Sequence, residues 1–196
     1  TKIYYDEVEV ILKEIARIKE KFGIELHTIN LGGGLGIKYT ENDEPPTIDE
    51  IAKQITTSVE ENSKKYNTGD ITIFIEPGRS IIGTSGITLY TVGSSKQVPK
   101  GRKYVAVDGG MADNPRPSLY QALYTAQVAN KPGAPLAQTI TLAGRFCESG
   151  DILIKDVEMP ELEEGDIICV YDTGAYGYSM SSNYNRVLKP AEIGRA

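Results

Sequence analysis

The chain has 196 residues, 40% of them hydrophobic and 24% charged, which is enough to bury a core and typical of a globular protein. Its formal net charge is −6 and its lysines and arginines are scattered, which argues against nucleic acid as a partner and favours a small molecule. The cysteines Cys147 and Cys169 form no CxxC pair, and no apolar run approaches the roughly 18 residues of a membrane span. We therefore expect a cytoplasmic protein with no metal site and no membrane partner.

The N-terminal part has the pattern of a parallel α/β unit. Apolar residues at spacings of three and four predict an amphipathic helix over 6–22, and a strand follows over 25–31. A second helix is expected after Thr47, which can form a capping box with Glu50. The β-branched run 71–75 predicts a short buried strand. The order helix, strand, helix, strand indicates parallel strands.

After about Gly83 the sequence changes to short β-prone stretches separated by Gly, Pro and Asp. They lie at 87–92, 104–107, 139–143, 152–154 and 167–171, and one helix is expected among them at 118–129. The predicted fold class is thus α/β plus all-β. We expect residues 1–85 to form the first domain and residues 86–196 a mostly antiparallel, sandwich-like or barrel-like β domain.

Two expected strands end in motifs that suit a ligand. Gly32-Gly33-Gly34 would let backbone N–H groups approach an anion such as phosphate, with a flexible turn as the alternative. Glu76-Pro77-Gly78-Arg79 sets a carboxylate near a guanidinium, with a surface salt bridge as the alternative. Ligands of α/β proteins bind at the carboxyl ends of parallel strands, which favours a site here. His27, the sole histidine, lies in the expected strand and is expected to be structural.

The β-rich part contains further candidate residues. Arg116 could clamp a carboxylate or lie in solvent. Cys147 and Glu148 couple a potential acid with a carboxylate, although a buried inert cysteine is the alternative. That inert role is our interpretation of Cys169. Tyr176 lies in a loop with glycines on both sides, where its hydroxyl could contact a ligand. The alternative is that its ring only packs against a turn.

Taken in chain order, these motifs resemble those of diaminopimelate decarboxylases, within the alanine-racemase-like, fold type III group of pyridoxal-phosphate enzymes. The matching segments are Leu31–Ile37, Glu76–Arg79, Asp108–Met111, Arg116-Pro117 with Leu119-Tyr120, Cys147–Asp151, Gly174–Gly177 and Ser181–Asn185. The resemblance spans nearly the whole chain. It implies that residues 1 to about 85 are the final part of a (β/α)₈ barrel, and that the remainder is the β domain that completes the active site in a homodimer.

The resemblance also implies a role for each matched residue. The residues implied to bind pyridoxal phosphate are Gly34, Glu76, Gly78, Arg79 and Tyr176, and the Glu76 carboxylate would face the pyridine nitrogen. Contact with the amino-acid substrate falls to Arg79, Arg116, Tyr120, Glu148 and Tyr176. Cys147 matches the proton donor to the α-carbon, which reaches in from the partner subunit.

The implied reaction is the decarboxylation of meso-2,6-diaminopimelate to L-lysine and CO₂, the last step of lysine biosynthesis. The first barrel strands, with the Schiff-base lysine, are missing from the sequence, so we expect a fragment that is inactive alone and needs the N-terminal half-barrel. One alternative is a related arginine, ornithine or carboxynorspermidine decarboxylase. Another is a non-catalytic dimerisation or interaction module derived from such an enzyme. Glu148 and Arg116 favour a substrate with both charges at its far end, which ornithine lacks.

Overall fold

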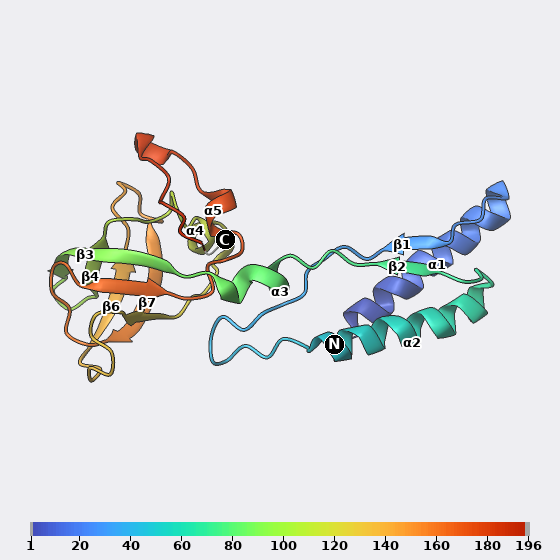
Figure 1. Cartoon of the computed structure of the whole chain (residues 1–196), viewed down its shortest axis with the longest axis horizontal. Helices are drawn as coiled ribbons and strands as arrows, with labels where there is room; N and C mark the ends of the chain where they lie inside the picture. The colour runs from blue at the N-terminus through green and yellow to red at the C-terminus, as the bar shows by residue number, and fades with distance from the viewer. Residues whose placement is uncertain (1, 195–196) are drawn as a thin grey trace. The chain divides into compact units, whose positions relative to one another are not determined.

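The computed structural model describes residues 2–194, which divide into two compact units (Figure 1). Within that range, unit 1 consists of residues up to Gly36 and of Glu44–Gly78. Unit 2 consists of Ile37–Asp43 and of the residues from Arg79 onward. No helix among residues 2–194 is both long and apolar enough to cross a membrane.

Unit 1 contains two helices and a pair of parallel strands. Its elements are α1 (Ile3–Phe22), β1 (Thr28–Asn30), α2 (Ile48–Tyr66) and β2 (Thr72–Phe74). The helices pack against each other, and Ile29 of β1 lies opposite Ile73 of β2. The predicted capping box of α2 is confirmed: the Thr47 hydroxyl accepts from the Glu50 N–H at 3.2 Å, and the Glu50 carboxylate accepts from the Thr47 N–H at 2.8 Å.

Both strands of unit 1 lie where they were predicted, but two expectations about them were wrong. The run 71–75 is not buried, since the side chains of Phe74 and Ile75 are 55% and 45% exposed. The sheet of unit 1 has only two strands, and one layer of helices packs on it. That layer buries Ile29 but leaves Phe74 and Ile75 exposed to solvent. His27 precedes β1 instead of lying within it, and its side chain is exposed, 3.7 Å from the Glu25 carboxylate.

Unit 2 is built on a six-stranded sheet in the order β5-β8-β3-β4-β6-β7. Only β4 and β6 are parallel neighbours, so the prediction of a mostly antiparallel β region is confirmed. The strands are β3 (Thr88–Gln97), β4 (Lys103–Val107), β5 (Ala126–Val128), β6 (Gln138–Ala143), β7 (Ile152–Met159) and β8 (Ile167–Val170). The short helices are α3 (Arg79–Ile82), η1 (Gly83–Ser85), α4 (Arg116–Tyr120), α5 (Gly177–Met180) and η2 (Tyr184–Arg186).

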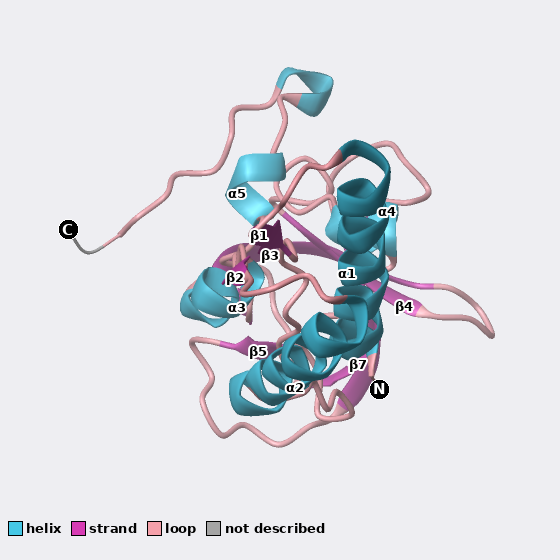
Figure 2. Ribbon diagram, turned by 90° about the vertical axis from the view of Figure 1, so that its right-hand side faces the viewer, coloured by secondary structure: helices cyan, strands magenta, loops and turns pink. Residues whose placement is uncertain are grey.

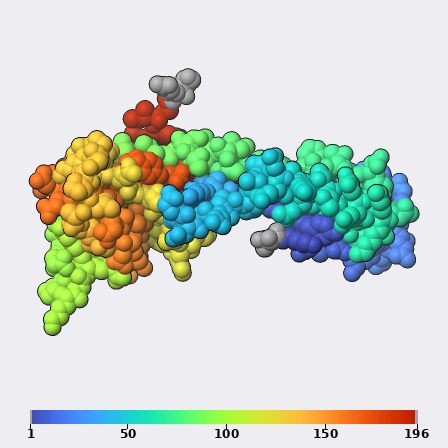
Figure 3. Space-filling model, turned by 90° about the horizontal axis from the view of Figure 1, so that it is seen from below, coloured from blue at the N-terminus to red at the C-terminus, as the bar shows by residue number. Residues whose placement is uncertain are grey.

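The core of unit 2 consists of apolar side chains from every strand of this sheet. Its buried members are Tyr90, Val92, Val105, Val107, Tyr124, Val128, Ile140, Leu142, Leu153, Met159, Ile168 and Val170. Alternating strand residues supply the same face, as a half-buried sheet requires. The hairpin between β3 and β4 projects from the surface of this unit (Figures 2 and 3).

The helix predicted over 118–129 was wrong for most of its length. The helix α4 ends at Tyr120, because Gln121 takes a left-handed conformation with φ of 54°. Ala126–Val128 then pairs with β8 as strand β5, so its backbone groups are bonded in the sheet. Pairing with a distant strand outweighed the local helical pattern.

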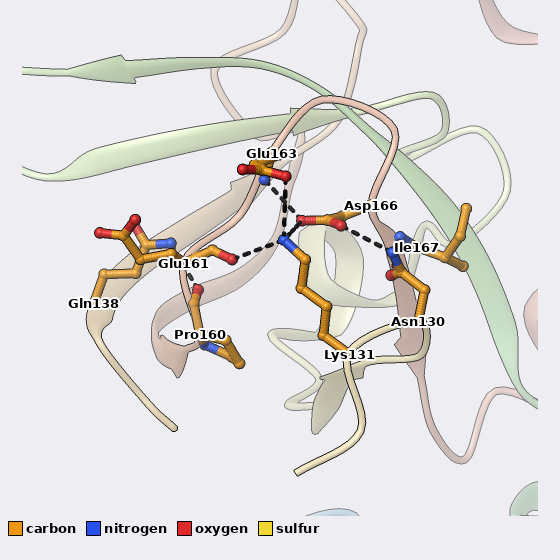
Figure 4. Close-up of polar contacts among 8 residues, drawn as sticks. All are labelled: Asn130, Lys131, Gln138, Pro160, Glu161, Glu163, Asp166 and Ile167. Atoms are coloured by element: carbon orange, nitrogen blue, oxygen red, sulfur yellow. Dashed lines mark hydrogen bonds and ion pairs between the residues drawn. The ribbon is translucent and has the colours of Figure 1, made fainter. Parts of the chain in front are cut away.

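A polar cluster holds the turn between β7 and β8 against the segment after β5 (Figure 4). The buried Asp166 carboxylate accepts from Lys131 Nζ at 2.7 Å, from Asn130 Nδ2 at 2.9 Å and from the Glu163 N–H at 2.7 Å. Asn130 Oδ1 in turn accepts from the Ile167 N–H at 2.9 Å. Asp166 therefore has partners for both oxygens, as a buried charge requires.

Candidate active site

In unit 1 the two predicted motifs meet at the carboxyl ends of β1 and β2. Asn30, the last residue of β1, donates from Nδ2 to Glu76 Oε1 at 2.5 Å and accepts from the Gly32 N–H at 2.8 Å. The Glu76 N–H donates to the Gly32 carbonyl at 2.6 Å. Sequence reasoning missed Asn30, although its place at the end of a predicted strand was a usable signal. The Asn30 amide fixes one oxygen of Glu76 and leaves Oε2 for a ligand.

The glycines of this motif are required by the backbone geometry. A Cβ on Gly33 would overlap the carbonyl oxygen of Glu76. Gly34 is exposed and has φ of +85°, a conformation that other residues rarely adopt. The chain can therefore approach an anion closely here, beside a carboxylate that could face a protonated ring nitrogen. These features fit the phosphate and the pyridine nitrogen of pyridoxal phosphate.

Unit 2 contains a pocket of about 550 Å³ that brings four predicted residues together. The predicted members are Arg79, Arg116, Tyr120 and Tyr176, and the pocket is completed by Tyr39, Asp43, Ala122, Leu123 and Met180. Neither arginine forms an ion pair with a carboxylate in the described part of the chain. A guanidinium with restricted access to water and no paired carboxylate favours an anionic ligand.

Arg116 is the more buried of the two arginines, with 6% of its surface exposed. Its Nε donates to the Tyr124 hydroxyl at 2.9 Å. Its Cζ lies 5.8 Å from the ring centroid of Tyr120, one helical turn further along α4. The side chain is thus held from both sides, and its remaining N–H groups are available to a carboxylate.

Tyr39 lies between the two arginines. Its ring centroid is 5.9 Å from Arg79 Cζ and 6.0 Å from Arg116 Cζ, within the range of cation–π attraction. The ring also packs edge-on against Tyr124, with centroids 5.4 Å apart. Sequence reasoning missed both tyrosines, because Tyr39 is distant in the chain from both arginines and the spacing of eight between Arg116 and Tyr124 matches no local pattern.

Asp43 adds a carboxylate to the same pocket. Its Oδ2 accepts from the Thr40 N–H at 2.7 Å, from the Thr40 hydroxyl at 3.0 Å and from the Tyr39 N–H at 3.1 Å. These bonds, the Thr40 N–H foremost, lower the pKa of Asp43 and keep it ionised. Two guanidinium groups and a carboxylate together suit a ligand that carries charges of both signs.

Cys147 and Glu148 do not line this pocket. Cys147 is exposed, and Glu148 Oε1 accepts from the Tyr184 hydroxyl at 2.6 Å, which raises the pKa of Tyr184. The structure therefore does not bring these two residues to Arg116 within one chain. Cys169 is buried in β8 as predicted, and burial raises the pKa of its thiol. That environment suits an inert, structural cysteine.

Comparison with known proteins identifies the family of this chain. Residues 4–174 match the family model of the pyridoxal-dependent decarboxylase C-terminal sheet domain. A curated relative, the diaminopimelate decarboxylase of Bacillus subtilis, is 51% identical over 185 residues, which are 94% of this chain and 42% of that protein. The diaminopimelate decarboxylase of Synechocystis is 49% identical over 172 residues, 88% of this chain and 37% of that protein.

Solved structures give the same result. A diaminopimelate decarboxylase from M. jannaschii in complex with L-lysine has a TM-score of 0.85 and 34% identity, over 95% of this chain and 42% of that one. A lysine/ornithine decarboxylase from Vibrio vulnificus, at 21% identity and a TM-score of 0.77, shares the fold. This chain thus spans less than half the length of the relatives it matches. The resemblance inferred from the motifs is confirmed, and the chain belongs to the pyridoxal-dependent decarboxylases, whose C-terminal sheet domain it contains.

Proposed function

We propose that this chain is the C-terminal portion of a diaminopimelate decarboxylase, which converts meso-2,6-diaminopimelate to L-lysine and CO₂. The observation that carries the proposal is the pocket of unit 2, where two guanidinium groups and a carboxylate meet. A substrate with an ammonium and a carboxylate at its far end matches this set of charges, whereas ornithine has no distal carboxylate. The names of the relatives support the same substrate.

The two parts of the chain take different roles in this proposal. Residues 1–85 are the end of a (β/α)₈ barrel whose earlier strands belong to a preceding segment, and residues 86–196 are the β domain. The exposed apolar side chains on the two-stranded sheet of unit 1 support the first assignment. The free state of both cysteines fits a cytoplasmic setting.

Cofactor binding is assigned to Gly34, Glu76, Gly78, Arg79 and Tyr176. Pyridoxal phosphate, when bound, supplies a ring that accepts the electron pair left on the α-carbon as CO₂ departs. Glu76 keeps the ring nitrogen protonated, and the Asn30 amide orients its carboxylate for that contact. The left-handed conformation of Gly34 presents backbone to the phosphate.

Substrate binding is assigned to Arg79, Arg116, Tyr120, Tyr176 and Glu148. The two arginines hold the distal carboxylate, because an oriented guanidinium forms paired charge-assisted hydrogen bonds. Glu148 does not line the pocket of its own chain and belongs to the same loop as Cys147, so it pairs with the distal ammonium in the site of the partner subunit.

Cys147 is the proton donor to the α-carbon and serves the site of a partner subunit in a homodimer. The arrangement around α4 supports this sharing. Arg116 and Tyr120 line the pocket, while Ser118, two residues from each, donates at 2.5 Å to the carbonyl of Gly150 in the loop that carries Cys147. The loop therefore contacts a different face of α4 from the one that lines the pocket.

The test is a substrate comparison with the purified full-length protein. We expect release of CO₂ and formation of lysine from meso-2,6-diaminopimelate, and at least about 100-fold lower kcat/KM for ornithine and arginine, since each loses a buried charge pair. Comparable rates with ornithine or arginine would favour the related decarboxylases. No turnover of any amino acid, with the cofactor bound, would favour a non-catalytic module.

The shared site is tested by mixing two inactive variants of the full-length protein. Cys147→Ala should slow turnover greatly and leave cofactor loading nearly intact, because the thiol moves a proton and does not hold the ring. Mixed with a variant that lacks the cofactor-binding lysine, it should regain activity through heterodimers. Cys169→Ala, the matched control, should change only stability. Heterodimers without recovered activity would place the site within one chain.

A further inference from the structure

Two motifs of unit 2 meet at the carboxylate of Asp151. This side chain is only 3% exposed. Its Oδ1 accepts from the Met111 N–H at 2.7 Å, and its Oδ2 accepts from the Phe146 N–H at 2.8 Å. Met111 ends the Asp108–Met111 turn, and Phe146 directly precedes Cys147. One carboxylate thus ties the turn to the cysteine loop, which we define as Gly144–Asp151.

The cysteine loop is also closed by its own backbone. The Gly144 N–H donates to the Asp151 carbonyl at 2.9 Å, and the Asp151 N–H donates to the Glu148 carbonyl at 3.1 Å. The Arg145 N–H donates to the Gly109 carbonyl at 3.0 Å. The first residue of the loop, Gly144, is therefore bonded to the last, Asp151, and Cys147 and Glu148 lie between them.

Two glycines leave the space that the Asp151 carboxylate occupies. A Cβ on Gly110 or on Gly144 would overlap this carboxylate. Gly110 belongs to the turn and Gly144 to the loop, so each of the joined segments has a glycine at the junction. The carboxylate is consequently confined in position as well as hydrogen bonded.

We propose that Asp151 is a positioning residue for Cys147 and Glu148, because its carboxylate sets the distance of the cysteine loop from the Asp108–Met111 turn. The proposal rests on the proposed function of Cys147 as proton donor and of Glu148 as a substrate ligand. Proton transfer needs a donor within hydrogen-bond reach, and a displacement of about 1 Å can cost roughly 100-fold in rate. Two N–H donors require two acceptor oxygens, which a carboxylate has and an amide lacks.

The test compares two aspartate-to-asparagine variants of the full-length protein, Asp151→Asn and the control Asp156→Asn. Asp156 lies in β7, close to Asp151 in the chain, and pairs with Arg102 at 2.6 Å, outside the site. We expect Asp151→Asn to lower kcat at least about tenfold per bound cofactor. Hydrogen exchange at the Phe146 and Met111 amides should also become at least about tenfold faster, with exchange at Leu142 unchanged. The control should change none of these quantities.

The outcomes separate this proposal from the proposed function. Unchanged exchange at Phe146 and Met111 would show that the Asp151 carboxylate does not hold the cysteine loop to the turn. Faster exchange with an unchanged kcat would show that Asp151 does not position Cys147 and Glu148 for the reaction. If the unaltered protein shows no decarboxylase activity, the proposed function fails with every catalytic role built on it. The exchange rates would still test whether Asp151 holds the cysteine loop to the turn. Should Asp151→Asn fail to fold, Gly144→Ala displaces the carboxylate without removing it, and the same two changes are expected.

Discussion

The sheets of the two units differ in how completely their apolar residues are buried. In unit 2, β8, β3, β4 and β6 each have a hydrogen-bonded neighbour on both sides, and twelve apolar residues are buried in one cluster. In unit 1, β1 and β2 have only each other. Large apolar residues on or near this pair stay exposed, namely Phe22, Ile24, Leu26, Phe74 and Ile75.

The proposed function accounts for this difference. Parallel strands are usually covered on both faces, and a two-stranded sheet is marginally stable in water. Unit 1 has one layer of helices over a parallel pair, so part of its apolar surface has no cover within residues 2–194. The proposed barrel supplies that cover, whereas unit 2 already buries its core.

The largest effect that we expect concerns local stability. In the 196-residue chain, the amide of Thr72 in β2 donates to the His27 carbonyl at 2.7 Å and should exchange hydrogen at least about 100-fold faster than that of Leu142 in β6, because β6 has a bonded strand on both sides. Hydrogen exchange followed by NMR or mass spectrometry measures both amides. In the full-length protein the difference should shrink, and equal protection in the short chain would show that unit 1 is complete without further strands.

The second prediction concerns the pocket of unit 2. In the full-length protein, Arg116→Ala should lower kcat/KM for diaminopimelate by about 100-fold, or about 3 kcal/mol, through both a higher KM and a lower kcat. Arg102→Ala is the control, because Arg102 pairs with Asp156 outside the pocket. Steady-state kinetics decide the matter, and unchanged constants would remove Arg116 from the site.

Sequence reasoning succeeded where the determinants are local. The capping box of Thr47 and Glu50 depends on residues three apart. The glycines before Ile37 predict a backbone with positive φ, which Gly32 and Gly34 adopt. It failed for 118–129, because the strand β5 exists only through its pairing with β8. Tyr39 and Tyr124 were missed because both lie in loops, and their contacts with Arg116 form only when unit 2 has folded.

The third prediction concerns the stability of unit 2 away from its pocket. Asp166→Asn should lower the free energy of unfolding by about 2 kcal/mol, because the Lys131 ammonium and the Glu163 N–H lose a charged acceptor. Thermal unfolding of the chain measures it. Asp70→Asn, at an exposed aspartate in unit 1, is the control and should change little.

The pH dependence of that difference follows from the pKa of Asp166. Burial alone would raise the pKa, but the hydrogen bonds from Lys131, the Glu163 N–H and Asn130 outweigh burial and lower it. A carboxyl whose pKa is depressed on folding stabilises the protein above its unfolded pKa, and this contribution is lost as the pH falls through the folded value. The two proteins should therefore converge in stability in acid, and a constant difference down to low pH would contradict the charged role of Asp166.

The smallest effect is expected for Tyr124→Phe. The change removes the hydroxyl that accepts from Arg116 Nε and keeps the ring that packs against Tyr39. One lost acceptor for a buried guanidinium costs about 1 kcal/mol, so kcat/KM should fall by about fivefold in the full-length protein. Tyr171→Phe, which removes a hydroxyl bonded to Gln127, is the matched control and should leave kinetics unchanged.

The division of that loss between KM and kcat tells what Tyr124 does. Tyr124→Phe, unlike Arg116→Ala, keeps the guanidinium that aligns the distal carboxylate, so the lost hydrogen bond should weaken the ground state and the transition state about equally. KM should then rise while kcat stays nearly constant. A fall confined to kcat would instead link Tyr124 to the reacting end of the substrate, and the assignment of Arg116 to the distal carboxylate would have to be abandoned.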